Sequence, residues 1–193
     1  MLLTIIKEIK RCVSNDCYLA ALSTALTIPD ICGKAEYAND ENMKNNTKKR
    51  YVQWFDKYIG PYYKQFGVSK KEGVPDLPYP SGELIYQLRN SVLHSGMVDI
   101  DRNKLQEERN KVTKFQLMIP SKDKWYNPAG SASITRSPGG EELSREYTIA
   151  IPFLCEILCN IAEEYYNSNK EKFNFFQYNI VYERQGREYE QRG

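Results

Sequence analysis

Hydrophobic residues recur every three or four positions over most of the chain, which is the period of an amphipathic helix. In each of these stretches the polar residues fall on the opposite side. We therefore predict helices at residues 2–13, 17–26, 48–59, 81–96 and 152–165. The last of them begins at Pro152 and has the widest apolar stripe, so we expect it to lie in the core against the 81–96 helix.

The hydrophobic period changes to two between the later helices, as expected for β-strands. Residues 114–119 and 146–151 have this pattern, and a weaker strand is predicted near 133–136. Turn-forming residues separate the three stretches. The chain is therefore predicted to be mainly α, a helical bundle that carries a small antiparallel β insertion at about 112–151.

The boundaries of this pattern indicate one domain over residues 1–178, followed by a polar C-terminal tail at 179–193. A chain of 193 residues has room for one sizeable core but not for two full domains. Residues 39–47 are predicted to form a surface loop, and residues 101–111 an exposed helix. Pro29 is expected to end or kink the second helix near Thr27, and residues 31–38 are expected to resume the helix.

The stretch at 81–96 is marked as a helix at both of its ends. Ser81 is a good N-cap, and Gly96 stands where a left-handed C-terminal cap would fall. Arg89 lies within the apolar arc of this helix, and His94, the only histidine of the sequence, lies in its last turn. Because a desolvated guanidinium is costly without a partner, Arg89 either lines a cleft or pairs with another group.

A cluster of basic residues, Lys48, Lys49 and Arg50, opens the helix at 48–59, whose aromatic residues gather on one side. Basic residues beside aromatic ones can hold single-stranded nucleic acid through phosphate contacts and base stacking. In the other interpretation, the aromatic side chains are core residues and the basic ones form a solvated face. The sequence leaves both interpretations open.

Charge and cysteine content bear on the partners and the cellular compartment of the protein. A formal net charge of +2 neither demands nor excludes a nucleic-acid partner. The five cysteines are odd in number and form no CxxC pair, which indicates reduced thiols in a cytosolic protein. Charged residues interrupt the N-terminal apolar run, and no stretch reaches the length of a membrane span. We therefore expect a cytoplasmic protein without membrane association.

Several reaction classes lack their sequence motifs here. The chain has no phosphate-binding GK[ST] loop, no GxGxxG after a strand and no GxSxG elbow. One histidine and scattered cysteines do not supply zinc ligands at a recognised spacing, although Cys155 and Cys159 are one helical turn apart. No cysteine stands at an activating position for a Cys-His nucleophile pair. We expect neither a metal nor another cofactor.

The six residues from Arg89 to His94 carry the chemistry that remains. An arginine can stabilise a pentacovalent phosphorane, and a histidine can take or give a proton near neutral pH. Together they form a minimal set for RNA cleavage in which the 2′-hydroxyl of the RNA is the nucleophile, a route that needs no metal. The segment Arg89-Asn90-Ser91-Val92-Leu93-His94 resembles the Arg-x4-6-His motif of the HEPN superfamily.

This resemblance implies an HEPN-like helical bundle, in which a polar residue such as Asn90 often follows the arginine. Many HEPN proteins are metal-independent endoribonucleases of toxin-antitoxin, phage-defence or RNA-processing systems, and they act as dimers whose two motifs face each other across a cleft. The resemblance therefore implies a catalytic site of Arg89, His94 and Asn90, RNA as the substrate, a homodimer, and an antitoxin or other protein partner. The predicted strands are not part of the basic HEPN bundle.

Two other functions stay open. Some HEPN-like proteins have lost catalysis and serve as nucleotide-binding or protein-assembly modules, and in such a module Arg89 would have a structural ion pair. Alternatively, the inserted sheet binds another chain at an exposed edge.

The helix geometry adds a constraint on a catalytic Arg89 and His94. Residues five apart on a straight α-helix point about 140° apart, so these two side chains are not expected to meet easily within one chain. A two-fold dimer could bring the motifs of two chains together instead.

Overall fold

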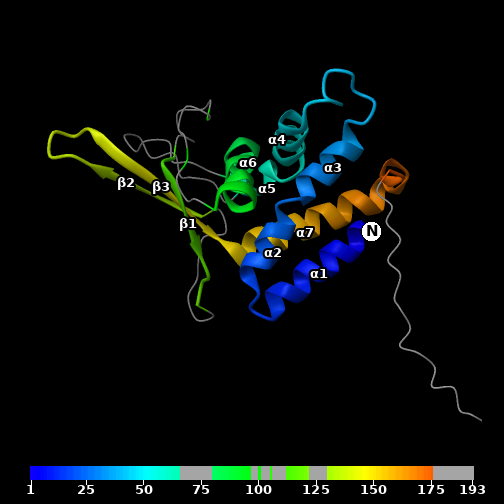
Figure 1. Ribbon diagram of the computed structural model, residues 1–193, viewed down its shortest axis with the longest axis horizontal. Coiled ribbons are helices and arrows are strands. Elements are labelled where there is room, and N and C mark those ends of the chain that lie inside the picture. The colour runs from blue at the N-terminus through cyan, green and yellow to red at the C-terminus, as the bar shows by residue number, and fades with distance from the viewer. Residues whose placement is uncertain (66–79, 97–99, 101–104, 106–111, 122–129, 176–193) are drawn as a thin grey trace, which may run out of the picture.

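The chain folds into a helical body from which a small β-sheet extends (Figure 1). The computed structural model describes residues 1–65, 80–96, 100, 105, 112–121 and 130–175. The α-helices in these ranges are α1 (Leu2–Ser14), α2 (Tyr18–Ala25), α3 (Ile28–Glu36), α4 (Thr47–Tyr58), α5 (Gly60–Gln65), α6 (Gly82–Asn90) and α7 (Ile151–Ser168). A π-helical turn, η1 (Ser91–Ser95), continues α6, and a short 3₁₀ helix, η4 (Lys170–Phe173), follows α7. The strands are β1 (Lys114–Met118), β2 (Ser131–Arg136) and β3 (Glu142–Ala150).

The predicted helices at 2–13, 17–26 and 48–59 are confirmed within one or two residues at each end. The expectation that the second helix ends near Thr27 is confirmed, since α2 ends at Ala25 and α3 begins at Ile28, with Pro29 in its first turn. A proline is tolerated there, since the backbone N–H groups of the first turn have no intrahelical acceptor. The chain therefore starts a new helix at Ile28, almost directly after α2.

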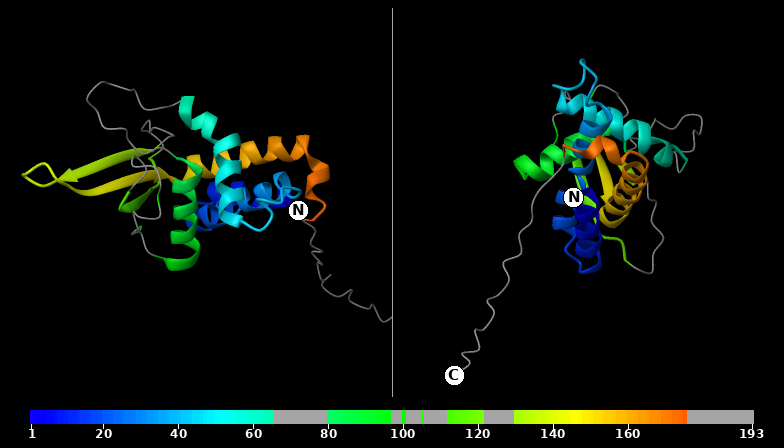
Figure 2. Two further views of the ribbon diagram at one scale, coloured as in Figure 1. Left: turned by 90° about the horizontal axis from the view of Figure 1, so that it is seen from above. Right: turned by 90° about the vertical axis from the view of Figure 1, so that its right-hand side faces the viewer.

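The core is formed where the apolar sides of the helices meet. Figure 2 shows α7 running along the body, and its main helical neighbours are α1 and α2. α3 packs chiefly on α4, and α4 in turn packs on α6. The prediction that α7 lies in the core is confirmed, whereas the 81–96 helix has α4 as its main helical neighbour. α6 directs its buried residues Leu84, Ile85 and Leu88 into the core next to α4.

A glycine allows α6 to lie this close to α4. A Cβ atom at Gly82 would overlap the carbonyl oxygen of Val52 and would stand 2.8 Å from the Val52 Cα. The backbone N–H of Gly82 also donates to Asp56 Oδ1 at 2.6 Å. The start of α6 is therefore held directly against the backbone of α4.

The aromatic residues of α4 are core residues. Tyr51, Trp54 and Phe55 are 0% exposed, and Tyr51 meets the ring of Tyr86 edge to face at 5.2 Å between ring centroids. The core interpretation of this aromatic cluster is therefore confirmed. The three rings are not free to stack with the bases of a nucleic acid.

The β insertion is confirmed, but its predicted antiparallel arrangement is only partly correct. The strand order is β1-β3-β2, in which β2 pairs antiparallel with β3 and β1 pairs parallel with it. β1 and β2 lie on opposite sides of β3 and are not paired with each other. β3 also begins at Glu142, earlier than predicted, and the β2–β3 hairpin projects away from the helices (Figure 1).

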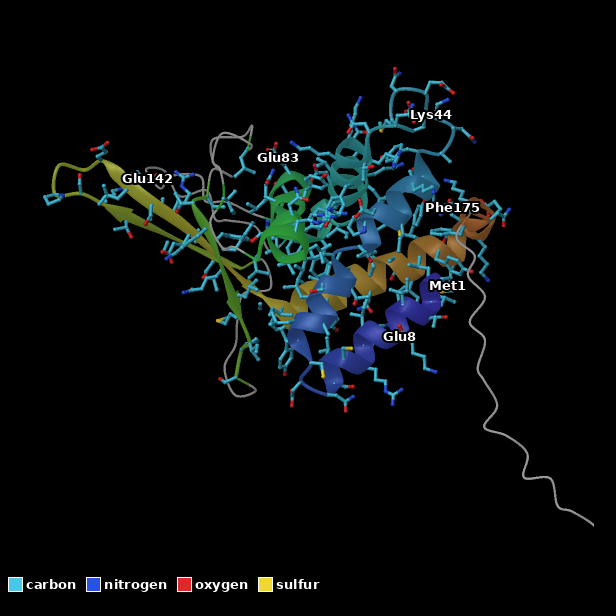
Figure 3. All side chains as sticks on the ribbon, in the orientation of Figure 1. Met1, Glu8, Lys44, Glu83, Glu142 and Phe175 are labelled. Carbon is cyan, nitrogen blue, oxygen red and sulfur yellow. The ribbon has the colours of Figure 1, made fainter. Side chains whose placement is uncertain are left out.

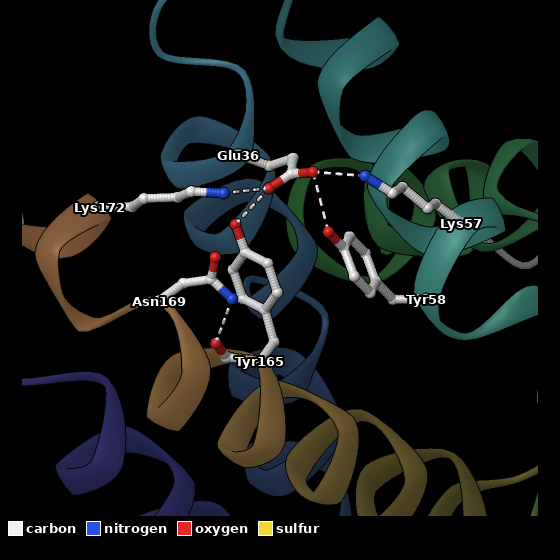
Figure 4. A network of polar contacts seen from close by, with 6 residues as sticks. All are labelled: Glu36, Lys57, Tyr58, Tyr165, Asn169 and Lys172. Carbon is white, nitrogen blue, oxygen red and sulfur yellow. Dashed lines mark hydrogen bonds and ion pairs between the residues drawn. The ribbon is translucent and has the colours of Figure 1, made fainter.

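One polar cluster ties the helical elements together at the other end of the body (Figure 4). The Glu36 carboxylate at the end of α3 accepts hydrogen bonds from Lys57 and Tyr58 of α4, from Tyr165 of α7 and from Lys172 of η4. Three separate elements, α4, α7 and η4, therefore donate to a single side chain of α3. The sequence around Glu36 does not indicate that its side chain accepts these hydrogen bonds.

Two predictions fall on residues that are not described. The exposed helix at 101–111 lies outside the described residues except for Leu105, which is buried. The polar tail at 179–193 also lies outside them. In the described part of the chain, no helix combines the length and the apolar character needed to cross a lipid bilayer.

Candidate functional site

The 81–96 segment forms the helix that its ends predict. The Ser81 side chain accepts a hydrogen bond from the backbone N–H of Leu84 at 3.2 Å, as an N-cap does. Gly96 has φ of 62° and adopts the left-handed conformation that closes many helices. Both predicted caps are confirmed, and they bracket Arg89 and His94.

The last turn of this helix is a π-helical turn, not an α-helical one. It spans Ser91–Ser95, and the backbone N–H of Gly96 donates to Ser91 O, five residues earlier, at 2.9 Å. A π-turn has more residues per turn than an α-helix, so residues five apart come close to the same side. Such turns are frequent at functional sites.

This turn brings Arg89 and His94 together within one chain. Arg89 Nη1 lies 3.2 Å from His94 Nε2. The expectation that the two side chains diverge is therefore wrong, because it assumed a straight α-helix through His94. The His94 side chain remains exposed to solvent, so its imidazole can reach a bound molecule.

Arg89 is also paired with a carboxylate from a distant part of the sequence. Its Nε donates to Asp30 Oδ2 at 2.8 Å, and the two side chains are 18% and 19% exposed. Asp30 lies in the first turn of α3, 59 residues before Arg89. The sequence predicted that Arg89 either lines a cleft or is paired, but it did not identify Asp30.

Two further neighbours fix the guanidinium of Arg89. Nη1 donates to Asn90 Oδ1 at 3.1 Å, and the Tyr86 ring lies against the guanidinium with 5.7 Å between Cζ and the ring centroid. The predicted site residues Arg89, Asn90 and His94 are thus in direct contact. Arg89 Nη2 has no hydrogen-bond partner among the described residues, and neither has the amide nitrogen of Asn90.

Two side chains near Arg89, those of Asp30 and Tyr51, are mostly or fully buried. Burial raises the pKa of the Asp30 carboxyl, and the hydrogen bond and charge of Arg89 oppose that rise. Burial likewise raises the pKa of the Tyr51 hydroxyl, and the nearby charge of Asp30 adds to the increase. Asp30 Oδ1 and the Tyr51 hydroxyl are both buried without a hydrogen-bond partner in the described structure.

The basic cluster at the start of α4 is mostly engaged with the protein itself. Arg50 Nη1 donates to the carbonyl oxygens of Met43 and Lys44, which lies in the loop between α3 and α4 (Figure 3). Lys48 lies 3.8 Å from Glu83. Among these three residues, only Lys49 is exposed and has a side chain without a partner in the described ranges. Binding of nucleic acid by Lys48, Lys49 and Arg50 therefore stays a prediction, and Lys49 is the residue best placed for it.

A separate groove of about 350 Å³ lies between α1 and α7, with Cys155 and Cys159 in its lining. Burial raises the pKa of each of these thiols to about 12. A thiol of this kind is almost entirely protonated at neutral pH, and the thiolate is the reactive form. These cysteines are therefore poor nucleophiles. No group of three or more metal-binding side chains comes together in the described part of the chain.

Comparison of the chain with protein-family models, with curated proteins and with solved structures finds no match. Function is therefore inferred from the geometry around Arg89 and His94.

Proposed function

We propose that the protein is an HEPN-like, metal-independent endoribonuclease that cleaves RNA by attack of the RNA 2′-hydroxyl on the adjacent phosphorus. The contact between Arg89 Nη1 and His94 Nε2, 3.2 Å apart where α6 continues into η1, is the observation that carries this proposal. A permanent cation and a solvent-exposed imidazole lie side by side, as phosphoryl transfer to an internal hydroxyl requires.

Each predicted residue has a role in this reaction. The 2′-oxygen forms a bond to phosphorus while its proton is removed, and the bond from phosphorus to the 5′-oxygen breaks as that oxygen takes up a proton. His94 exchanges one of these protons as the general acid or base. Arg89 stabilises the negative charge that builds up on the phosphorane oxygens. Asn90, in contact with Arg89, orients the phosphate through its free amide group.

The wider setting follows from the same resemblance and belongs to the proposal. It comprises a homodimer, an antitoxin or other protein partner, a cytoplasmic location, and a role in toxin-antitoxin or phage-defence systems. Because Arg89 and His94 already meet within one chain, the dimer is not needed to pair them. In the proposed dimer, two complete Arg89–His94 pairs would face one RNA strand.

The test is RNA cleavage by purified protein in the presence of EDTA. We expect the unsubstituted protein to cleave single-stranded RNA, and His94→Gln and Arg89→Lys each to lower the rate by about 100-fold or more, the usual contribution of such groups. Glu146→Gln, which removes a partly buried ion pair with Lys114 in the sheet, should cleave normally. Intact RNA after incubation with the unsubstituted protein would refute the proposal, as would full activity of His94→Gln.

A second candidate function is a non-catalytic nucleotide-binding or assembly module. The ion pair between Arg89 and Asp30 favours it, because the same contact also fits an arginine with a structural role. In that case Arg89→Ala leaves the Asp30 carboxylate without its partner and lowers the free energy of unfolding by about 3 kcal/mol. RNA would stay intact with every variant. The cleavage assay with the unsubstituted protein therefore separates the two functions.

A further inference from the structure

The guanidinium of Arg89 is held by the protein at Nε, at Nη1 and on one face of its plane. Asp30 binds Nε, Asn90 and His94 contact Nη1, and the Tyr86 ring lies against the guanidinium. Nη2 is the one guanidinium nitrogen that has no partner among the described residues. The proposed chemistry does not itself account for Asp30 or Tyr86.

The ion pair with Asp30 has an unusual form for a structural arginine. Arginine and a carboxylate frequently pair through two parallel hydrogen bonds, which would use both carboxylate oxygens and a second guanidinium nitrogen. Here only Nε and Oδ2 pair, at 2.8 Å, while Oδ1 stays buried without a donor. An arginine whose task was only to neutralise Asp30 would be expected to satisfy Oδ1 as well.

We propose that Asp30 is a positioning residue, which together with Tyr86 orients Arg89 so that its Nη2 binds a non-bridging oxygen of an RNA phosphodiester. Asp30 fixes the edge of the guanidinium opposite Nη1, and Tyr86 prevents rotation of its plane. The side chain is thereby oriented before the substrate arrives, which avoids the entropic cost of ordering a long side chain during binding. The catalytic consequence rests on the proposed function, whereas binding of a phosphodiester does not.

The variant Asp30→Asn tests this directly, because it keeps the size of the side chain and removes its charge. Tyr86→Leu is the second variant, since it keeps bulk but not the flat ring. Glu146→Gln is the matched control, because it removes a partly buried carboxylate in another ion pair. Binding is measured with a short oligodeoxythymidylate, which has phosphodiesters but no 2′-hydroxyl to cleave. The imidazole proton NMR signal of His94 reports binding at the site without ambiguity, because the chain has no other histidine.

In the unsubstituted protein and in Glu146→Gln, we expect the His94 signal to shift as oligodeoxythymidylate is added. In Asp30→Asn the titration should need at least about tenfold more ligand, and kcat for RNA should fall by about 10–100-fold, as when a reacting group is misplaced. Tyr86→Leu should reduce kcat in the same direction. Asp30→Glu should restore part of the activity, which a purely structural loss of packing would not predict.

The outcomes separate this inference from the proposed function. A His94 signal that does not move in the unsubstituted protein overturns the inference, and so do unchanged binding and kcat in both Asp30→Asn and Tyr86→Leu. If Asp30→Asn fails to fold, the binding and kcat of Tyr86→Leu are the test: a decrease supports the inference, and unchanged values overturn it. If oligodeoxythymidylate binds and RNA stays intact, the proposed endoribonuclease function is refuted, whereas the proposed phosphodiester-binding site at Arg89 is supported.

Discussion

Single residues of this protein gain their roles from partners that are distant in sequence, and Glu36 shows this most clearly. Its carboxylate accepts hydrogen bonds from Lys57 at 2.5 Å and from Tyr58, Tyr165 and Lys172, each at 2.8 Å. Burial alone would raise the pKa of this carboxyl, but the four donors together lower it to about 2. Glu36 therefore remains ionised in the folded protein well below the pH at which an unfolded glutamate takes up a proton.

The low pKa of Glu36 predicts a loss of stability in acid. Because the folded pKa lies below the unfolded value, the contribution of Glu36 is complete above about pH 5 and is lost as the pH falls toward 2. Glu36→Gln should remove about 3 kcal/mol from the free energy of unfolding at neutral pH and much less near pH 2. Denaturant unfolding at several pH values measures both effects.

Glu163→Gln is the control for this experiment, because it removes the exposed partner of Lys10. Exposed ion pairs contribute little, so its effect should stay within about 1 kcal/mol. An equal loss of stability in both variants, or a loss in Glu36→Gln that does not diminish in acid, would contradict the role assigned to Glu36.

At the scale of elements, the position of α6 depends on how closely it approaches α4. Gly82 lies where the two helices come closest, and any side chain there would overlap the backbone of α4 at Val52. The same helix ends in the π-turn that carries His94 back to Arg89. The packing of α6 on α4 and the conformation of its last turn therefore both determine where the catalytic residues of the proposed site lie.

Gly82→Ala should destabilise the protein by about 1–3 kcal/mol, because the new methyl group meets backbone atoms that cannot move aside as a flexible side chain could. Gly139→Ala is the matched control, since its Cβ would come no closer than 3.8 Å to the Ser137 Oγ. That control should change the free energy of unfolding by no more than about 0.5 kcal/mol. Thermal or denaturant unfolding compares the two, and equal stability of the two variants would show that α6 can move away from α4 at little cost.

At the scale of the whole molecule, the helical body and the projecting sheet carry different candidate sites. The proposed site lies on the body, at the end of α6, whereas the β2–β3 hairpin extends away from it (Figure 1). The outer strands β1 and β2 flank β3, so an interaction of the sheet with another chain would involve one of these two. The proposed RNA cleavage and the proposed binding of a protein partner would therefore use separate parts of the chain.

The proposed homodimer predicts a mass in solution of twice that of one chain, measured by light scattering after size-exclusion chromatography. If two sites act on one RNA strand, activity per chain should fall on dilution to the range where the dimer dissociates. A mixture of unsubstituted protein with His94→Gln would then show less activity than the unsubstituted fraction predicts. Constant activity per chain in a monomeric sample would rule out a role for the dimer in cleavage.

The parts of the fold that depend on neighbouring residues could be predicted from the sequence. The helix periods, the two caps of the 81–96 segment and the presence of three strands all follow from local pattern and local hydrogen bonding, and they are confirmed. The direction of strand pairing could not be predicted, because the local pattern of a strand is the same in parallel and antiparallel pairs, and β1 pairs parallel with β3.

The sequence by itself determined that Arg89 would need a partner or a cleft and that His94 was the only imidazole of the chain, because desolvation of a guanidinium is costly in any fold. Only the tertiary structure decided that Asp30 is that partner and that a π-turn brings His94 against Arg89. The physical reason is that a partly buried guanidinium is stabilised by a carboxylate, but any of the 25 acidic residues of the chain could supply that carboxylate. Packing makes the selection, by placing the first turn of α3 beside α6.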